Sequence, residues 1–329
     1  MPTELGGGGL GLTAAAQVVR ELGAACSSTA MVVTMHYAGT AALAAAGVDD
    51  VLREIAAGRH ITTLAFSEVG SRSHFWSPVS SATADGDEVV LDARKSWVTS
   101  AGEADSYVWS SRPLEADDPM TLWYVPADAP GLTVGAPFDG LGLRGNSSSP
   151  VEAEGVRVPR SALLGTDGAG LDLAMTAVLP VFLLLNASAS VGLLRTLAQE
   201  TAVHLQKTQL THLGQSLAQQ VLPRTSLARL QIESDRTRAL VDDALSAVES
   251  GREDAQLLVL EVKAAAGEAA ADAADLALRA CGGAAFRKES PVERLFRDSR
   301  AARVMAPTTD ALHDFVGRAL CGLPLLGDA

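Results

Sequence analysis

Aromatic residues are scarce in this sequence, and its cysteines form no recognisable pair. Phe, Trp and Tyr make up 4% of the 329 residues. Cys26, Cys281 and Cys321 are odd in number and widely spaced, without a Cys-x-x-Cys pair. This spacing gives no sign of a disulfide framework or a metal site, and it favours a reducing compartment. We therefore expect a cytoplasmic protein without a bound metal.

The sequence also has no basic surplus and no long apolar run, and we expect no leader. Its formal net charge of −13 disfavours binding to nucleic acid or to anionic membranes, because like charges repel. The first six residues are neither basic nor apolar enough for a signal peptide. Residues 179–185 form the most apolar run, which is too short to span a bilayer.

Hydrophobic residues, by contrast, are plentiful at 47% of the chain. A chain of this length and composition can bury a sizeable core, in two or three domains or in one layered unit. Ala, Leu and Gly dominate, which favours closely packed helices with small side chains at their contacts.

Apolar periodicity divides the chain into three parts. Residues 12–58 have helical spacing, with Ser27, Ser28 and Thr29 as capping candidates for a second helix over 31–43. From His60 the pattern becomes short β-type runs at 61–66, 88–91, 106–111, 121–125, 132–134 and 151–158. After Pro159 long helices are expected at 171–205, 217–250 and 254–281, with shorter ones at 292–305 and 309–320.

This order predicts an α+β fold. We expect an N-terminal helical segment over 1–59, a central antiparallel β-barrel or sandwich over 60–164, and a C-terminal four-helix bundle over 165–329. The apolar helices of the bundle also predict a homodimer or homotetramer.

Several motifs in the same order resemble the acyl-CoA dehydrogenase family of flavoproteins. The motifs are Pro2-Thr3-Glu4-Leu5-Gly6-Gly7, Phe66-Ser67-Glu68-Val69-Gly70-Ser71, Lys95-Ser96-Trp97-Val98-Thr99, Leu141-Gly142-Leu143-Arg144-Gly145, Cys281-Gly282-Gly283 and Arg297-Asp298-Ser299-Arg300. In the family the first motif follows further helices, so we expect either that the usual first helices are missing here or that the start of the sequence has been assigned too late. The resemblance implies a helix–β–helix fold and bound FAD.

The resemblance also implies which residues contact the cofactor. The Ser67 hydroxyl and Thr99 would bond the flavin ring, Trp97 would pack on it, and Ser73 would contact a phosphate. A flat aromatic ligand needs such an apolar face with a few donors at its rim. The full set implied for the cofactor is Phe66, Ser67, Ser73, Trp97, Thr99, Gly282, Gly283, Thr308 and Asp310.

At two positions the sequence differs from the family where the family carries its catalytic base. Dehydrogenation needs a carboxylate to remove the weakly acidic α-proton of the thioester. The position that matches the usual glutamate is Ala306, and the position that matches the alternative glutamate is Phe182. The catalytic residue is therefore unknown from the sequence, with His36 and His74 as weak candidates.

A third departure concerns the pyrophosphate of the cofactor. The family places an arginine of a neighbouring subunit there, and this chain has Leu210. Arg279 replaces a glutamine of the family. It either supplies the missing charge or lies exposed to solvent, and we favour the exposed position.

Three functions stay open. The first is α,β-dehydrogenation of an acyl thioester, on coenzyme A or a carrier protein, with a non-standard base. The second is a reduced-flavin-dependent monooxygenase on the same fold, served by a flavin reductase, and the third is a non-catalytic partner subunit or scaffold. The first reading also predicts an electron-transfer partner. Retention of Trp97 and Thr99 disfavours the non-catalytic role, since a scaffold has no need for residues that contact the flavin ring.

Overall fold

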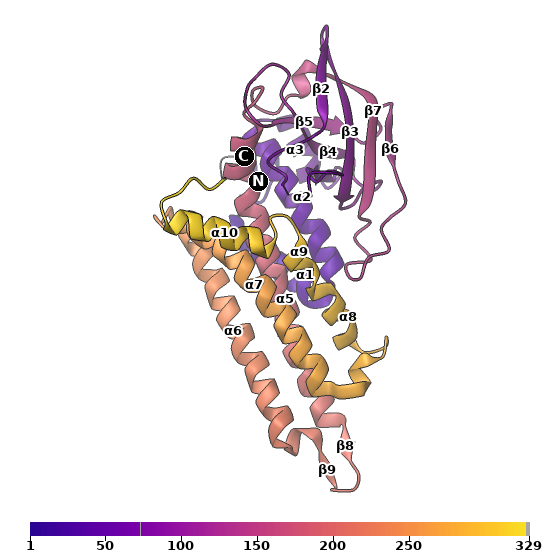
Figure 1. Ribbon diagram of the computed structural model, residues 1–329, viewed down its shortest axis with the longest axis vertical. Coiled ribbons are helices and arrows are strands. Elements are labelled where there is room, and N and C mark those ends of the chain that lie inside the picture. Colours follow the sequence, from indigo (N-terminus) through magenta and orange to yellow (C-terminus); the bar gives the residue numbers. More distant parts are fainter. Residues whose placement is uncertain (73, 327–329) are drawn as a thin grey trace. The chain divides into compact units, whose positions relative to one another are not determined.

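The computed structural model describes residues 1–72 and 74–326, and its elements are labelled in Figure 1. The chain divides into two compact units that interleave along the sequence. Unit 1 comprises Met1–Leu12, Met31–Gly140 and Arg144–Phe182, and unit 2 comprises Thr13–Ala30, Leu141–Leu143 and Leu183–Ala329. The expected boundaries at residues 59 and 164 stay a prediction.

Three helices open the chain, as the apolar spacing predicts. They are α1 (Leu12–Ala25), α2 (Ser27–Ala45) and α3 (Asp49–Ala56). In unit 2, α1 approaches α5 (Leu179–Lys207) so closely that a Cβ on Gly192 would lie 2.1 Å from the Arg20 carbonyl oxygen. Only glycine permits this contact, in agreement with the expected small side chains between helices.

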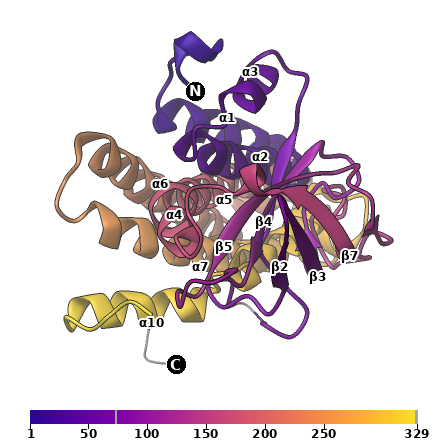
Figure 2. The same cartoon turned by 90° about the horizontal axis from the view of Figure 1, so that it is seen from above.

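Two sheets face each other in unit 1 (Figure 2). One has the order β1–β4–β5 and the other β2–β3–β7–β6. Residues from both sheets, among them Trp109, Trp123, Leu91 and Val156, share one buried core, which makes this part a sandwich. The strands are β1 (Thr62–Ala65), β2 (Ser81–Asp85), β3 (Glu88–Val98), β4 (Ser106–Ser111), β5 (Thr121–Pro126), β6 (Leu132–Val134) and β7 (Ser149–Pro159).

One strand pair corrects the expectation of an antiparallel domain. β1 and β4 run parallel, with Thr62 opposite Ser106 and Ala65 opposite Trp109. Parallel neighbours need a long connection, and the chain passes through β2 and β3 of the other sheet before it returns as β4. The other pairs among the seven strands are antiparallel.

Unit 2 is built from helices. Besides most of α5 it contains α6 (Val221–Ser250), α7 (Ala255–Cys281), α8 (Pro291–Ser299), α9 (Ala301–Val304) and α10 (Thr309–Leu320). Alanines of α7 pack with leucines of α5 in a common core. The N-terminal helices, β domain and C-terminal helices confirm the predicted fold class. A short hairpin, β8 (Gln209–Leu210) and β9 (Gln215–Ser216), was not predicted.

One helical stretch is long and apolar enough, by length and composition alone, to cross a membrane. Residues Gly170–Lys207 contain a window of mean hydropathy 2.0, of which 78% is buried inside the fold. The stretch combines α4 (Gly170–Leu173), a π-helical segment and α5, so it is longer than the run at 179–185. Because its apolar surface is mostly covered by protein, it is a core helix.

Candidate functional site

In unit 1 the Ser67 and Trp97 motifs lie side by side. The Ser96 backbone N–H donates to the Ser67 carbonyl oxygen (2.9 Å), and the Val69 N–H donates to the Arg94 carbonyl oxygen (3.0 Å). A β-bridge joins Glu68 to Lys95 between these two bonds. The structure therefore brings together two segments that are separated by almost thirty residues in sequence.

A buried ion pair fixes this contact. The Lys95 ammonium, which is fully buried, bonds the Glu68 carboxylate and also donates to the Ser110 carbonyl (2.6 Å) and hydroxyl (2.9 Å) oxygens. The Glu68 carboxylate in turn accepts from the Val79 (2.6 Å) and Ser80 (3.0 Å) backbone N–H groups. These partners satisfy both charges inside the protein, as a buried pair requires.

Burial lowers the pKa of Lys95 to about 8, against the opposing effect of Glu68. Burial opposes ionisation of Glu68 as well, but the charge of Lys95 and the hydrogen bonds keep its pKa below the usual value. Both groups are therefore charged at neutral pH.

Trp97 lies where β3 becomes irregular. The pairing with β7 shifts register between Lys95 and Val98, and Trp97 has a left-handed φ of 57°. Its indole is 59% exposed and stacks on Phe138 with ring centroids 4.1 Å apart. The irregularity thus presents an aromatic side chain at the surface of unit 1, next to a strand whose other face is buried.

The remaining implied cofactor residues of unit 1 differ in their burial and in their hydrogen bonds. Thr99 is buried, and its hydroxyl lies 3.4 Å from that of Ser148. The Ser67 side chain makes no hydrogen bond within the described part of the chain, so its hydroxyl is free to bind a ligand. Phe66 is buried against Phe75, with ring centroids 6.4 Å apart.

An exposed indole and a free hydroxyl on two adjoining segments fit the rim of a flat ring system such as the flavin of FAD. Ser73, the implied phosphate contact, lies outside the described residues.

In unit 2 the implied cofactor residues fall in two separate places. Gly282 follows the end of α7 with a left-handed φ of 64°, and it and Gly283 have open space where a side chain would be. Thr308 caps α10 by accepting from the Ala311 N–H (3.3 Å), and Asp310 lies exposed in its first turn.

These two places are distant from each other within one chain. The Pro307 carbonyl oxygen accepts a hydrogen bond from Lys263 of α7. Lys263 precedes Gly282 by nineteen residues. At 1.5 Å per residue this corresponds to about 28 Å along the helix. The two sets therefore cannot contact the same small part of one ligand.

The side chains expected near the pyrophosphate supply no free cation. Leu210 belongs to β8 and pairs with Gln215 of β9. Arg279 is exposed and forms an ion pair with Asp275 one turn earlier on α7 (3.0 Å). Its position is the solvent-exposed one that the sequence favours.

The two base positions carry no ionisable group. Phe182 is buried on α5, and Ala306 is partly buried in the segment between α9 and α10. Of the candidate replacements, His36 is mostly buried and its Nδ1 lies 3.2 Å from the Thr62 backbone N and 3.3 Å from its carbonyl oxygen. Burial lowers the pKa of His36, so this histidine is neutral near pH 7.

His74 is in a different environment. It is exposed, its ring packs edge-on against Trp76 at 5.0 Å, and its Nδ1 lies 3.1 Å from the Ser71 carbonyl oxygen. The catalytic roles of both histidines stay predictions.

A titratable group that the sequence analysis missed lies beside Ala306. Lys263 of α7 is fully buried, and its Nζ donates to the carbonyl oxygens of Met305 (2.9 Å) and Pro307 (2.6 Å). Burial alone lowers the pKa of Lys263 to about 7. A lysine on the alanine-rich face of α7 was the only sequence signal, because a charged residue rarely lies among small apolar ones without a partner.

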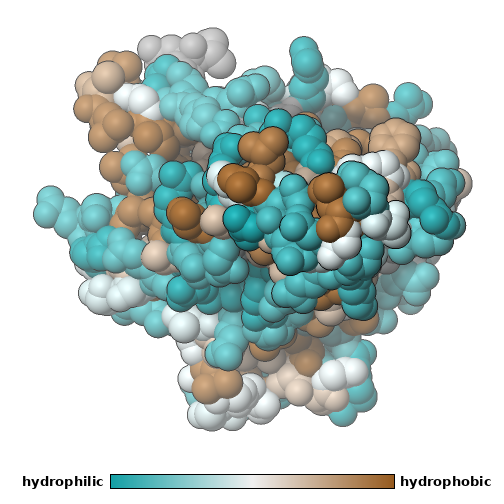
Figure 3. Space-filling view, turned by 90° about the horizontal axis from the view of Figure 1, so that it is seen from below, coloured by the Kyte–Doolittle hydropathy of each residue, from teal (hydrophilic) through white to brown (hydrophobic). Residues whose placement is uncertain are grey.

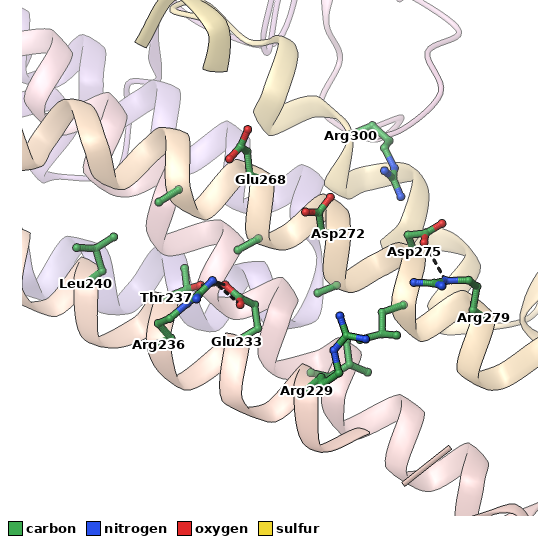
Figure 4. A pocket seen from close by; sticks show the side chains of 15 residues that line it. Arg229, Glu233, Arg236, Thr237, Leu240, Glu268, Asp272, Asp275, Arg279 and Arg300 are labelled. Carbon is green, nitrogen blue, oxygen red and sulfur yellow. Dashed lines mark hydrogen bonds and ion pairs between the residues drawn. The ribbon is translucent and has the colours of Figure 1, made fainter. Parts of the chain in front are cut away.

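A charged groove of about 770 Å³ also lies in unit 2, along α6 and α7 (Figure 4). Glu233 pairs with Arg236 on α6 (2.7 Å), and Asp275 pairs with Arg279 on α7. Glu268 and Asp272 add acidic groups on the α7 side, and Arg229 and Arg300 add basic ones. The groove carries both signs of charge and therefore has no preference for an anion or a cation as a whole.

Comparison with protein families places these features in a known context. The N-terminal domain of acyl-CoA dehydrogenases matches residues 1–57, the middle domain matches 63–156 and the C-terminal domain matches 168–321. The short-chain specific acyl-CoA dehydrogenase of Homo sapiens mitochondria is 28% identical over 318 residues, which cover 94% of this chain and 76% of the relative. Cyclohex-1-ene-1-carbonyl-CoA dehydrogenase of Syntrophus aciditrophicus is 26% identical, with coverages of 97% and 78%.

Solved structures agree on the fold. Butyryl-CoA dehydrogenase from Megasphaera elsdenii superposes with a TM-score of 0.91 at 20% identity, over 98% of this chain and 86% of that one. A glutaryl-coenzyme A dehydrogenase complex gives 0.92 at 22% identity, over 99% and 84%. With the three domain matches in order along the sequence, the chain belongs to the acyl-CoA dehydrogenase family of FAD-dependent oxidoreductases.

Proposed function

We propose that this protein catalyses α,β-dehydrogenation of an acyl thioester, bound to coenzyme A or to a carrier protein, with a base other than the usual glutamate. The observation that carries the proposal is the exposed Trp97, whose segment is joined to that of the free Ser67 hydroxyl by the buried Glu68–Lys95 pair. A family member that had lost its cofactor would have no need to keep an exposed indole and a buried ion pair behind it.

Within this proposal the residues of unit 1 orient the cofactor. FAD, when bound, supplies the hydride acceptor. Trp97 would cover the edge of its ring system, and the Ser67 hydroxyl would donate to a ring heteroatom. Phe138 would support the indole from its other side.

The α-proton must leave to a base that the family positions do not supply. The methyl group of Ala306 and the phenyl ring of Phe182 cannot accept a proton. Ordinary saturated acyl-CoA esters are therefore poor substrates in this proposal. A thioester whose α-proton is more acidic, through conjugation or a second electron-withdrawing group, fits such a site better.

Electrons leave by a separate route. We infer an electron-transferring protein as the partner, a homodimer or homotetramer as the assembly, and the cytoplasm as the compartment.

The test is anaerobic mixing of the FAD-loaded protein with a series of acyl-CoA esters while the flavin absorbance is followed. Bleaching, together with formation of the enoyl product, is the expected outcome. The esters with the more acidic α-protons should react faster than simple saturated ones. Absence of bleaching with every ester and with carrier-bound acyl groups would refute the proposal.

A second function is favoured by one observation, the lack of a carboxylate at both base positions. A reduced-flavin-dependent monooxygenase on this fold needs no base for an α-proton. Rapid oxygen consumption by the reduced protein, with incorporation of one oxygen atom into a product, would indicate this activity. A protein that binds no flavin at all would instead be a non-catalytic partner or scaffold.

A further inference from the structure

Lys263 is a buried amine without an acidic partner. Its side chain has no exposed surface, and no charge–charge interaction contributes to its lowered pKa. Among the described residues no carboxylate forms an ion pair with it. An unpaired buried amine destabilises a fold, so its hydrogen bonds are the feature that accounts for its presence.

Those hydrogen bonds bracket one residue. Lys263 Nζ donates to the carbonyl oxygens of Met305 and Pro307, which are the neighbours of Ala306 on either side. A neutral amine has two N–H groups and an ammonium has three. Both carbonyl groups are therefore satisfied whichever protonation state Lys263 adopts.

Other contacts fix the ends of the same segment. The Met305 N–H donates to the Ala301 carbonyl oxygen in α9 (3.0 Å), and the buried Asn186 amide lies 3.4 Å from the Met305 sulfur. Thr308 caps α10 with its hydroxyl. Between these two anchors, Lys263 is the side chain that holds the backbone of residues 305–307.

We propose that Lys263 is a positioning residue, which fixes the backbone on both sides of residue 306 and so determines where the side chain at that position lies. The proposal rests on the proposed function in that position 306 matches the base of the family. It implies that the segment keeps its shape without a glutamate, because the contacts that hold it come from α7 and not from residue 306.

The first test is hydrogen exchange of the full-length protein, measured by mass spectrometry on peptides that cover residues 301–312. Lys263→Met removes both donors at similar size, and Lys207→Met changes an exposed lysine as the control. We expect about tenfold faster exchange at residues 305–309 in Lys263→Met alone, with α5 and the rest of α7 unchanged. Unchanged exchange in this segment, or equal loosening of all of unit 2, would overturn the proposal.

Should Lys263→Met fail to fold, Lys263→Gln is measured in its place. Glutamine keeps two N–H donors but is shorter than lysine, so it bonds at most one of the two carbonyl groups well. The same local loosening is expected, and exchange at the wild-type rate in this variant would likewise overturn the proposal.

The second test separates positioning from general stabilisation. Lys263→Met is combined with Ala306→Glu, and steady-state dehydrogenation is measured at equal FAD content. We expect kcat to fall about tenfold relative to Ala306→Glu alone while KM stays within about twofold. An unchanged kcat, or a fall in kcat matched by a similar rise in KM, would mean that Lys263 has only a structural role, which overturns the proposal.

The two tests distinguish failure of the proposed function from failure of the role proposed for Lys263. If neither the wild type nor Ala306→Glu dehydrogenates any thioester, the proposed function is wrong, and the exchange measurement still decides the role of Lys263.

Discussion

The buried amine of Lys263 makes the stability of the protein depend on pH. Its pKa is about 7 in the folded protein and about 10.4 in an unfolded chain. Between these values the unfolded state binds more protons, so the free energy of unfolding rises with pH, and the cost of burying the charge is fully present below pH 7.

Relative to Lys263→Met, the wild type should therefore gain about 2–3 kcal/mol in stability between pH 7 and pH 9. Urea unfolding of both proteins at the two pH values measures this difference. Lys95, whose pKa is also lowered, is present in both and cancels. Parallel pH profiles for the two proteins would contradict the prediction.

Ala306 is the residue at which a gain of activity is expected. General-base catalysis typically contributes about 10²–10⁴-fold in rate, so Ala306→Glu should raise the oxidation of saturated acyl-CoA esters clearly above the wild-type level. The paired change Ala306→Glu with Pro307→Gly also removes the backbone constraint of the neighbouring proline, and Ala306→Gln is the matched control without a base. Robust turnover by the wild type would show that this position is not limiting and would direct attention to His36 and His74.

At the scale of elements, the Glu68–Lys95 pair joins β3 to the segment that carries Ser67. Lys95→Met leaves a buried carboxylate without its cation, which should destabilise the protein by about 3–5 kcal/mol. The double change Glu68→Gln with Lys95→Met removes both charges and should recover part of that loss. Chemical denaturation of the three proteins, with the change at Lys207 as a surface control, measures the effect. A double variant less stable than Lys95→Met would show that the unpaired carboxylate is not the cause of the loss.

The elements themselves could largely be predicted from the sequence, because they depend on local periodicity. β4 (Ser106–Ser111) and α10 (Thr309–Leu320) begin and end where the pattern predicts. β2 was missed since most of its residues are exposed and polar, and the parallel pairing of β1 with β4 depends on contacts between distant segments.

The candidate site could be predicted only in part, for the same reason. The motif order draws attention to Ser67 and Trp97, whose roles stay predictions, but no periodicity indicates that Glu68 and Lys95 form a buried pair between the two segments. The contact of Lys263 with the segment at Ala306 spans more than forty residues. Such a contact is set by the packing of α7 against α9 and α10, which the sequence alone does not reveal.

At the scale of the whole molecule we expect a dimer or tetramer formed through the C-terminal helices. In the view from below, hydrophobic areas are separated by hydrophilic ones (Figure 3). The charged groove along α6 and α7 is one candidate for the contact between copies. Arg229 and Arg236 of one copy could then face Glu268 and Asp272 of another.

Sedimentation at micromolar concentration tests this expectation, and a monomer would count against it. If the groove is the contact, Arg229→Glu should weaken association and high salt should do the same. Association that is insensitive to both would place the interface elsewhere.

We also expect the protein to retain FAD less tightly than other members of its family. Each charge-assisted bond to the pyrophosphate contributes about 1.5–3 kcal/mol, and Leu210 cannot make one. FAD should therefore be lost on dilution and gel filtration, and Trp97→Ala should accelerate the loss. Leu210→Arg should tighten retention, whereas Gln209→Arg on the same strand serves as the control. Stoichiometric FAD through gel filtration in the wild type would contradict this reasoning.

The chain contains only four lysines, and their locations offer a way to observe breathing of the native protein. Lys207 and Lys288 are exposed, whereas Lys95 is enclosed in unit 1 and Lys263 in unit 2. An amine-reactive reagent should therefore modify the first two at once and each of the other two only when its own unit opens. Mass spectrometry of a single labelling time course would then report the opening rates of both units separately, without any substitution.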